Sequence, residues 1–204
     1  MYATFQGDGW TREMVSTTGA PIITSLALDS ADHPRVAYMT VNAVRYAWYD
    51  GSTWHNEDID VGAAATSLGT LVLNDEGYPR IAYVLENELR YAYYSNGQWH
   101  VQVVDSGQSY GELSLALFPN GQPAISFHNI TSRSLIFTYP ICSLTTCEWP
   151  LTTIDIYDAG ISNSMKIAPD GSIHISYYDG AGQTLRYASY GVKDERVYLP
   201  LMTK

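Results

Sequence analysis

A repeat of roughly 45 residues constrains this chain more than any other feature of its sequence. An aromatic residue that opens a Tyr-Ala or related motif recurs with spacings of 44, 45, 46 and 50 residues, at Tyr2, Tyr46, Tyr91, Phe137 and Tyr187. Tryptophan follows this aromatic residue by eight positions in three copies and by twelve in the next, at Trp10, Trp54, Trp99 and Trp149. Landmarks that return in register along the whole chain indicate an array of equal structural units.

Each unit predicts four short strands, which we call a, b, c and d. A third landmark, Pro-Arg-Val-Ala-Tyr at 34–38 in the first full copy, follows a turn sequence and precedes the Tyr-Ala strand. In that copy we expect strands near 25–29, 34–40, 44–50 and 53–60. Asn-Gly and Asp-Gly pairs mark the corresponding turns in later copies and are strong hairpin signals. No segment has helical periodicity.

Four antiparallel strands repeated at this interval are typical of the blades of a β-propeller, an all-β fold. A sandwich or a lipocalin-like barrel does not explain landmarks in register. We expect one propeller domain over 1–204, with an N-terminal half blade at 1–21 and four complete blades at about 22–65, 66–111, 112–160 and 161–204. Strand d of the last copy falls at 196–201, where Pro200 weakens it as a ladder strand.

The half blade raises the question of closure, because residues 2–15 correspond to strands c and d without their own a and b. Three arrangements stay open: a compact four- or five-bladed ring with the hairpin as a partial blade, a fragment of a larger propeller, and closure by a partner chain. We expect self-association or ring closure through residues 1–16, since an isolated hairpin is marginal in water and an unpaired strand edge favours association.

Composition limits the classes of function. A net charge of −10 with scattered basic residues argues against nucleic-acid binding. No run of 18 apolar residues is present, so no membrane span is expected. The N-terminus lacks the basic start and apolar stretch of a signal peptide, so any export signal would lie upstream of this chain.

The two cysteines, Cys142 and Cys147, lie in the insertion that lengthens the fourth Tyr-to-Trp spacing. A local disulfide within a hairpin loop is the favoured interpretation, and it would place the protein in an oxidising compartment, outside the cell or on its surface. Free thiols are the alternative. Without a second Cys or His pair nearby no zinc site is expected, and no cofactor motif is present.

These landmarks resemble the bacterial propeller repeats described as BNR or Asp-box-like and sialidase-like, and more distantly NHL repeats and propeller lectins. The resemblance is carried by Leu-Ala-Leu-Asp at 26–29, Pro-Arg-Val-Ala-Tyr at 34–38, Arg-Tyr-Ala-Trp-Tyr-Asp-Gly at 45–51 and the following Trp54. It extends over nearly the whole chain and implies the fold rather than one activity, because such blades occur in glycosidases, lectins and adhesive surface proteins. A strict Asp box is absent, and the sialidase arginine triad and Tyr/Glu pair do not map onto the chain.

Two repeated residue types predict structural roles. A tryptophan at a fixed position in every blade is expected to pack blades together. The aspartates six residues after three of the tryptophans, Asp60, Asp105 and Asp155, are expected to accept hydrogen bonds from loop amides. Trp48 differs, since its counterparts are Thr4, Tyr93 and Ser189, and it is therefore a candidate for stacking on a ligand.

Functional sites are expected at the mouth formed by the d–a and b–c loops. In addition to Trp48, the ligand-binding candidates are polar residues of these loops that do not repeat: Glu86, Glu88, Tyr110, His128, Arg133 and Tyr178. Carboxylates that could supply the acid and base of a glycosidase are Glu112, Asp158 and Asp179. Solvated loop charge would also account for them.

The favoured function is an extracellular binding or scaffold propeller with carbohydrate as ligand. One alternative is a glycoside hydrolase of sialidase-like or arabinanase-like type, which would need inequivalent carboxylates gathered at one mouth. Another is a structural repeat fragment without a ligand.

Overall fold

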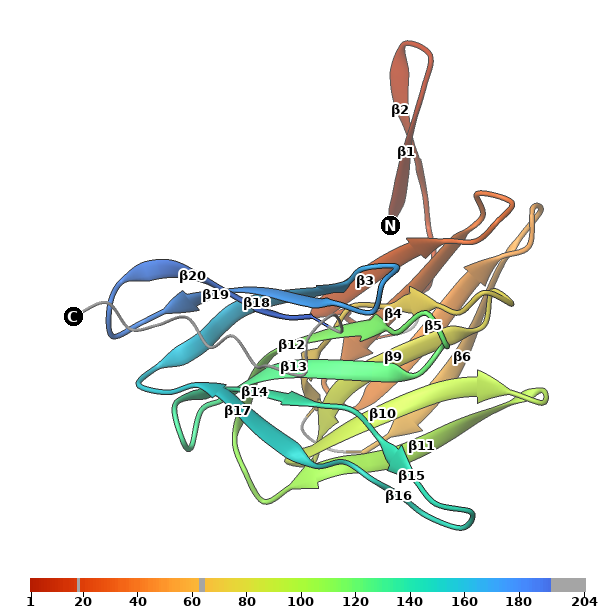
Figure 1. The fold of residues 1–204 in the computed structure, drawn as a ribbon. Coiled ribbons are helices and arrows are strands. Elements are labelled where there is room, and N and C mark those ends of the chain that lie inside the picture. Colours follow the sequence, from red (N-terminus) through yellow and green to blue (C-terminus); the bar gives the residue numbers. More distant parts are fainter. Residues whose placement is uncertain (18, 63–64, 192–204) are drawn as a thin grey trace.

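The computed structural model describes residues 1–17, 19–62 and 65–191, and every regular element in them is a β-strand (Figure 1). The first repeat sheet contains β3 (Ile23–Leu28), β4 (Pro34–Thr40), β5 (Ala43–Tyr49) and β6 (Trp54–Val61). The second contains β7 (Ala65–Leu68), β8 (Val72–Leu73), β9 (Pro79–Leu85), β10 (Glu88–Ser95) and β11 (Gln98–Ser106). The third contains β12 (Tyr110–Leu117), β13 (Pro123–Asn129), β14 (Ser134–Thr138) and β17 (Leu151–Asp155). The fourth contains β18 (Ala159–Ile167), β19 (Ile173–Asp179) and β20 (Thr184–Tyr190).

All pairings in the described residues are antiparallel and follow chain order, so the first three repeat sheets are meanders of strands a, b, c and d, and the fourth is described as strands a, b and c. The strands expected in the first full copy lie within two residues of their predicted bounds, and strand b matches at both ends. The all-β prediction without helices is therefore confirmed for the described residues. The number of blades and the boundaries at 22–65, 66–111, 112–160 and 161–204 stay predictions. Strand d of the last copy, predicted at 196–201, lies outside the described residues.

Neighbouring repeat sheets stack face to face, and three hydrophobic clusters fill the spaces between them. Met39 and Tyr46 of the first sheet pack with Ile81 of the second, and equivalent clusters join the second sheet to the third and the third to the fourth. Sheets in the middle of the stack are buried on both faces. This explains the weak alternation of apolar and polar residues along their strands.

The repeated tryptophans make the same contact at three successive interfaces. Each lies 5.5–5.6 Å, between ring centroids, from the strand c aromatic of the preceding unit, in the pairs Trp54–Tyr2, Trp99–Tyr46 and Trp149–Tyr91. The predicted role of these three residues in joining units is confirmed. Trp10 is different, because 66% of its surface is exposed and its ring contacts only Phe5 of its own hairpin among the aromatic rings of the described residues.

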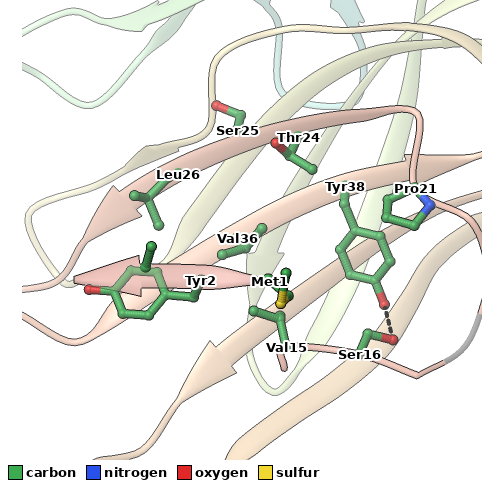
Figure 2. Close-up of a pocket in the computed structure, with 11 residues that line it drawn as sticks. Met1, Tyr2, Val15, Ser16, Pro21, Thr24, Ser25, Leu26, Val36 and Tyr38 are labelled. Atoms are coloured by element: carbon green, nitrogen blue, oxygen red, sulfur yellow. Dashed lines mark hydrogen bonds between the residues drawn. The ribbon is translucent and has the colours of Figure 1, made fainter. Parts of the chain in front are cut away.

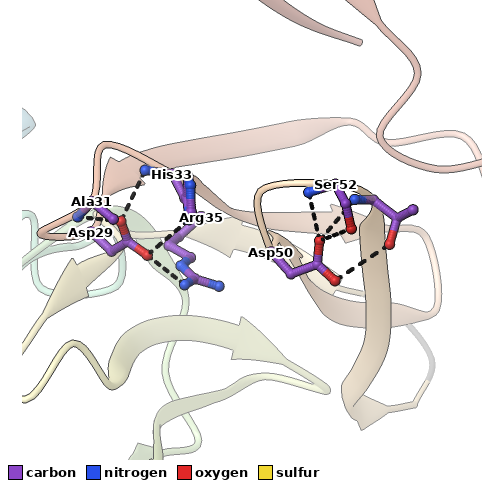
Figure 3. Close-up of polar contacts among 7 residues, drawn as sticks. Asp29, Ala31, His33, Arg35, Asp50 and Ser52 are labelled. Carbon is purple, nitrogen blue, oxygen red and sulfur yellow. Dashed lines mark hydrogen bonds and ion pairs between the residues drawn. The ribbon is translucent and has the colours of Figure 1, made fainter.

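The turns between strands a and b satisfy their backbone through aspartate or asparagine side chains, and Figure 3 shows the first of these turns, at Asp29. In the first sheet Asp29 Oδ1 accepts hydrogen bonds from the amides of Ala31 and His33, both at 2.9 Å. The residue two positions before the first residue of the b-strand motif has a positive φ in all four sheets: Asp32 (60°), Gly77 (81°), Gly121 (80°) and Gly171 (83°). Glycine suits this left-handed conformation, and aspartate is among the few other residues that tolerate it.

The cysteine insertion forms a small hairpin between β14 and β17, made of β15 (Ile141–Cys142) and β16 (Cys147–Glu148). Cys142 and Cys147 are directly opposite in this hairpin and form a disulfide, as predicted. The hairpin is exposed, so the bond constrains a surface loop and not the core.

The N-terminal hairpin, β1 (Tyr2–Gln6) and β2 (Gly9–Glu13), pairs only with itself among the described strands and projects from the edge of the first sheet (Figure 1). Its base docks on that sheet. The side chain of Asn56 donates to the carbonyl of Val15 at 2.9 Å, and Trp54 Nε1 donates to Glu13 at 3.0 Å. The second bond repeats the one from Trp99 Nε1 to Glu57 at 2.8 Å between the first two sheets. The hairpin therefore meets the first sheet as strands c and d of a preceding unit would.

Candidate functional site

The d–a and b–c loops gather at one end of the sheets, which we call the loop face. Backbone hydrogen bonds join them directly: the amide of Ile130 donates to the carbonyl of Ser109 at 2.9 Å, and that of Asp158 to the carbonyl of Arg133 at 2.7 Å. Side chains from different sheets are consequently held close together at this end.

A repeated bulge shapes the loop face before any charged residue is considered. The pairing of strands c and d shifts register at the same place in three sheets, between Val44 and Arg45 in the first and at equivalent residues in the second and third. The extra residue on strand d, such as Ile59, points into the core between sheets. The residue after the bulge is the repeated aspartate. A bulge changes the direction of the side chains that follow it, and so it sets the direction of this aspartate.

These aspartates clamp one sheet to the next. Asp60 Oδ2 accepts hydrogen bonds from the hydroxyl of Tyr83 at 2.7 Å and from Arg90 Nη1 at 2.7 Å, both on the second sheet. We call this arrangement the Asp–Tyr–Arg clamp. Burial, with the Asp60 carboxylate beside it, raises the pKa of Tyr83.

The clamp recurs between the third and fourth sheets, where Asp155 Oδ2 accepts from Tyr177 at 2.7 Å and Arg186 at 2.9 Å. Loop amides were the expected donors to the repeated aspartates, but among the described bonds only Asp155 receives one, from Ile156 at 2.8 Å. The expectation was wrong because the main donors to these aspartates are tyrosine and arginine side chains of the next sheet, and it considered only the turn in which each aspartate lies. The Arg-Tyr-Ala sequence that recurs at 45–47, 90–92 and 186–188 was the signal that could have identified the arginine.

The third sheet lacks the Tyr and Arg of the clamp, and a different group of side chains lies at its loop face. We call Glu112, His128, Arg133 and Asp158 the charged cluster. Arg133 forms a two-point ion pair with Asp158, with Nε to Oδ1 at 3.2 Å and Nη2 to Oδ2 at 3.1 Å. Glu112 approaches from the other side, with its Oε2 at 3.9 Å from His128 Nδ1.

His128 is the buried member of the charged cluster. Burial lowers the pKa of its imidazole, against the opposing influence of the Glu112 and Asp158 carboxylates. Its Nε2 has no hydrogen-bond partner among the described residues. A buried ring nitrogen without a partner is costly. The atom has almost no contact with solvent, so a ligand at the surface would meet the cluster at Glu112 and Arg133, whose side chains are 52% and 65% exposed.

Two glycines allow the charged cluster to pack this tightly. A Cβ at Gly111 would lie 2.9 Å from His128 Nδ1, and one at Gly180 would clash with Asp158 Oδ2. Either substitution would therefore force a member of the cluster to move.

The structure brings only part of the predicted site together. Glu112, His128, Arg133 and Asp158 form the charged cluster. Glu86 and Glu88 lie on the second sheet, where both pair with Arg90 at 3.6 Å and 2.8 Å, beside the clamp.

The other three ligand-binding candidates have different surroundings. Tyr110 is buried, and its hydroxyl donates to Asp105 at 3.0 Å. Tyr178 is exposed on the outer face of the fourth sheet. Trp48 lies on β5 away from the loop face, stacked against Tyr46 and His55 with centroids 5.8 Å and 5.1 Å apart.

The carboxylates considered for catalysis, Glu112, Asp158 and Asp179, also differ in their burial and in their partners. Asp179 is buried, accepts hydrogen bonds from the amides of Ala181 and Gly182, and pairs with Arg186 at 2.6 Å. Its bonds are used within the protein. The ion pair with Arg133 lowers the pKa of Asp158, which therefore favours the ionised form. Such a group suits the binding of a donor better than general-acid chemistry.

The charged cluster is an open surface patch, and two hollows of the structure lie elsewhere. One, of about 230 Å³, separates the base of the N-terminal hairpin from the first sheet (Figure 2). The other, of about 260 Å³, lies among the a–b turns of the second to fourth sheets, at the opposite end from the loop face.

Two other features are absent from the described residues. They contain no helix that is long and apolar enough to cross a membrane. Within the same residues no group of three or more His, Cys, Asp or Glu side chains is arranged to hold a metal ion.

No protein-family profile matches the chain, and no curated protein sequence matches it. Solved structures do match in fold. The leech intramolecular trans-sialidase aligns over 91% of this chain and 35% of its own length, with 16% identity and a TM-score of 0.56. The NanB sialidase from Streptococcus pneumoniae aligns over 83% of this chain and 31% of its own, with 19% identity and a TM-score of 0.55. The Aleuria aurantia lectin, solved with α-methyl-L-fucoside, aligns over 94% and 66%, with 14% identity and a TM-score of 0.56.

These likenesses show the fold. The chain has the β-propeller-type architecture that its sequence resemblance implied, and it spans about a third of the two sialidases and about two thirds of the lectin.

Proposed function

We propose that this protein is a carbohydrate-binding β-propeller that acts outside the cell or on its surface, with the charged cluster as its binding site. The observation that carries the proposal is the pair of exposed charged side chains, Glu112 and Arg133, which lie beside buried His128 and the Asp158 carboxylate. Glycans present dense arrays of hydroxyls that both donate and accept hydrogen bonds. Carboxylates accept from such hydroxyls, and guanidinium and imidazole groups can donate to them.

The neighbours in fold support this class of ligand, since they include a lectin solved with α-methyl-L-fucoside and a leech trans-sialidase solved with 2,7-anhydro-Neu5Ac. The disulfide between Cys142 and Cys147 supports an oxidising compartment. The site is open, which suits a ligand that is held at the surface.

A glycoside hydrolase of sialidase-like or arabinanase-like type is the second candidate, favoured by Glu112 and Asp158 on either side of His128. Two observations weigh against it. The pKa of Asp158 is lowered, and the tyrosines of the loop face that donate to aspartates have raised pKa values, which makes them weaker nucleophiles. Arg90, Arg133 and Arg186 pair with three different carboxylates, Asp60, Asp158 and Asp155, and so do not act as one triad.

A glycan array tests the proposal, followed by titration of the best-bound glycan. His128→Val is the sharpest variant, because Val84 occupies the equivalent position in the second sheet and is buried there. It should keep the fold and weaken binding several-fold, because it removes the imidazole whose Nδ1 lies 3.9 Å from the Glu112 carboxylate. Glu76→Ala, in an exposed turn at the opposite end, is the control and should bind as the wild type does.

Absence of binding to any glycan by the folded protein would contradict the proposal, and so would full binding by His128→Val. Hydrolysis of a fluorogenic sialoside or arabinoside that is lost in Glu112→Gln would support the hydrolase instead.

A further inference from the structure

The two ends of the sheet stack carry complementary halves of an interface that recurs between neighbouring units. At three successive internal interfaces a strand d tryptophan of one unit packs on a strand c aromatic of the preceding unit. On the N-terminal hairpin Trp10 stands at the tryptophan position with 66% of its surface exposed. On the fourth sheet Tyr187 stands at the aromatic position and is 55% exposed.

The outer face of the fourth sheet exposes a residue whose equivalents are buried. Leu185 is 81% exposed, whereas its equivalents Val44, Leu89 and Leu135 are fully buried. Strand b also has one uncovered face, because buried residues of β19 alternate with partly or fully exposed ones, while β9 and β13 are buried almost throughout.

The hairpin carries the matching surface. The rings of Phe5 and Trp10 lie 5.5 Å apart at an interplanar angle of 64°. These values are close to the 5.5 Å and 74° of Tyr94 and Trp99, of which Trp99 packs against the first sheet. Phe5 and Trp10 of the hairpin therefore have the same relative arrangement as the aromatic pair whose tryptophan packs on a preceding unit. In Figure 1 the hairpin and β20 are well separated, so the hairpin of a molecule does not cover that molecule's own fourth sheet.

We propose that the outer face of the fourth sheet, around Leu185 and Tyr187, binds the Phe5–Trp10 surface of the N-terminal hairpin of a second copy of this chain. The contact repeats the internal interface between units, and it is heterologous: two different surfaces meet head to tail. Each copy keeps one surface of either kind free, so association continues until a ring closes or a filament forms.

Sedimentation velocity over a range of concentrations tests the proposal on the full chain. The wild type should form species larger than a monomer, increasingly so with concentration. Trp10→Ala removes one surface and Leu185→Asp with Tyr187→Ser removes the other, so each variant alone should be monomeric. An equimolar mixture of the two should form dimers and stop there, because only one productive contact remains. Val103→Asp, which places a charge at an exposed site on β11, should assemble as the wild type does.

Three results would overturn the proposal. A wild type that stays monomeric at the highest concentration excludes a second copy as occupant. Variants that lower the melting temperature without changing the mass would show that the face is covered within one molecule. Variants that keep the wild-type mass would place the contact elsewhere. If Trp10→Ala disrupts its own hairpin, the fourth-sheet variant decides alone.

Discussion

Two arginine–aspartate pairs at the loop face use the same chemistry in different surroundings. Arg90 and Asp60 have side chains only 15% and 18% exposed, and Tyr83 shares the carboxylate. Arg133 and Asp158 are 65% and 27% exposed, and no tyrosine is among their described hydrogen-bond partners. The first pair joins two sheets, and the second lies on the rim of the charged cluster beside His128.

The difference shows how solvent determines what such a pair does. Exposed pairs are screened by water and salt and contribute little to stability, whereas removing one partner of a buried pair leaves an uncompensated charge. The clamp at Asp60 is therefore expected to stabilise the fold, and the pair at Arg133 to be free to exchange partners with a ligand. Four measurements can break or sharpen this contrast.

Asp60→Ala should have the largest effect. It removes the acceptor shared by Tyr83 and Arg90, and we expect a loss of about 3 kcal/mol in the free energy of unfolding, the scale for breaking a buried pair. Urea unfolding followed by tryptophan fluorescence measures it. Asp58→Ala, at a carboxylate that is 49% exposed and pairs with Arg45, is the control and should cost much less. Equal losses for the two variants would show that the clamp has no special role.

Tyr83→Phe should cost about 1 kcal/mol, the net value of one hydrogen bond, because the ring stays and only the hydroxyl is lost. The third sheet already has Phe127 at this position, fully buried. Tyr177→Phe removes the equivalent bond of the second clamp and should behave alike. A neutral result in both variants would mean that Asp60 and Asp155 are held by their arginines alone.

His128 should make stability depend on pH. Burial lowers its pKa in the folded protein below the unfolded value, so the unfolded chain binds more protons between the two. Stability is therefore expected to fall as the pH drops from about 6.5 toward the lowered pKa of the folded state. The His128→Val variant should lose less stability between pH 7.5 and 5.5 than the wild type. Parallel curves for the two proteins would contradict burial of a neutral imidazole.

Arg133→Ala should have the smallest effect on stability, with no resolvable change in melting temperature, because its guanidinium is exposed. Binding of the glycan identified on the array should nevertheless weaken about tenfold or more, as for a lost charged hydrogen bond. Circular dichroism melting and titration calorimetry give the two readouts. A marked fall in melting temperature would show that this pair also stabilises the fold and would remove the contrast with Arg90.

Much of the fold followed from local sequence patterns. The spacing of the aromatic landmarks and the turn pairs predicted the strands of the first full copy to within two residues, and the cysteine spacing predicted the disulfide. These features depend on neighbours in the chain. The candidate site was only partly predictable: the loop positions of Glu112, His128, Arg133 and Asp158 suggested function, but nothing local separated them from Asp179 or Tyr110, which are buried and bonded within the protein.

The sequence by itself determined that this chain is an all-β repeat of the propeller type, because periodic aromatics, β-branched residues and turn pairs act over a few residues at a time. Only the tertiary structure decided which charges stabilise and which stay available. Asp60 bonds to Tyr83 and Arg90, which are 23 and 30 residues away in the chain. It does so at a bulge that no short sequence motif predicts. Burial of His128 and exposure of Leu185 likewise depend on whether another sheet covers that face. The residues next to it in the sequence do not predict whether a side chain is buried in this way, because the side chains that cover it come from a different repeat.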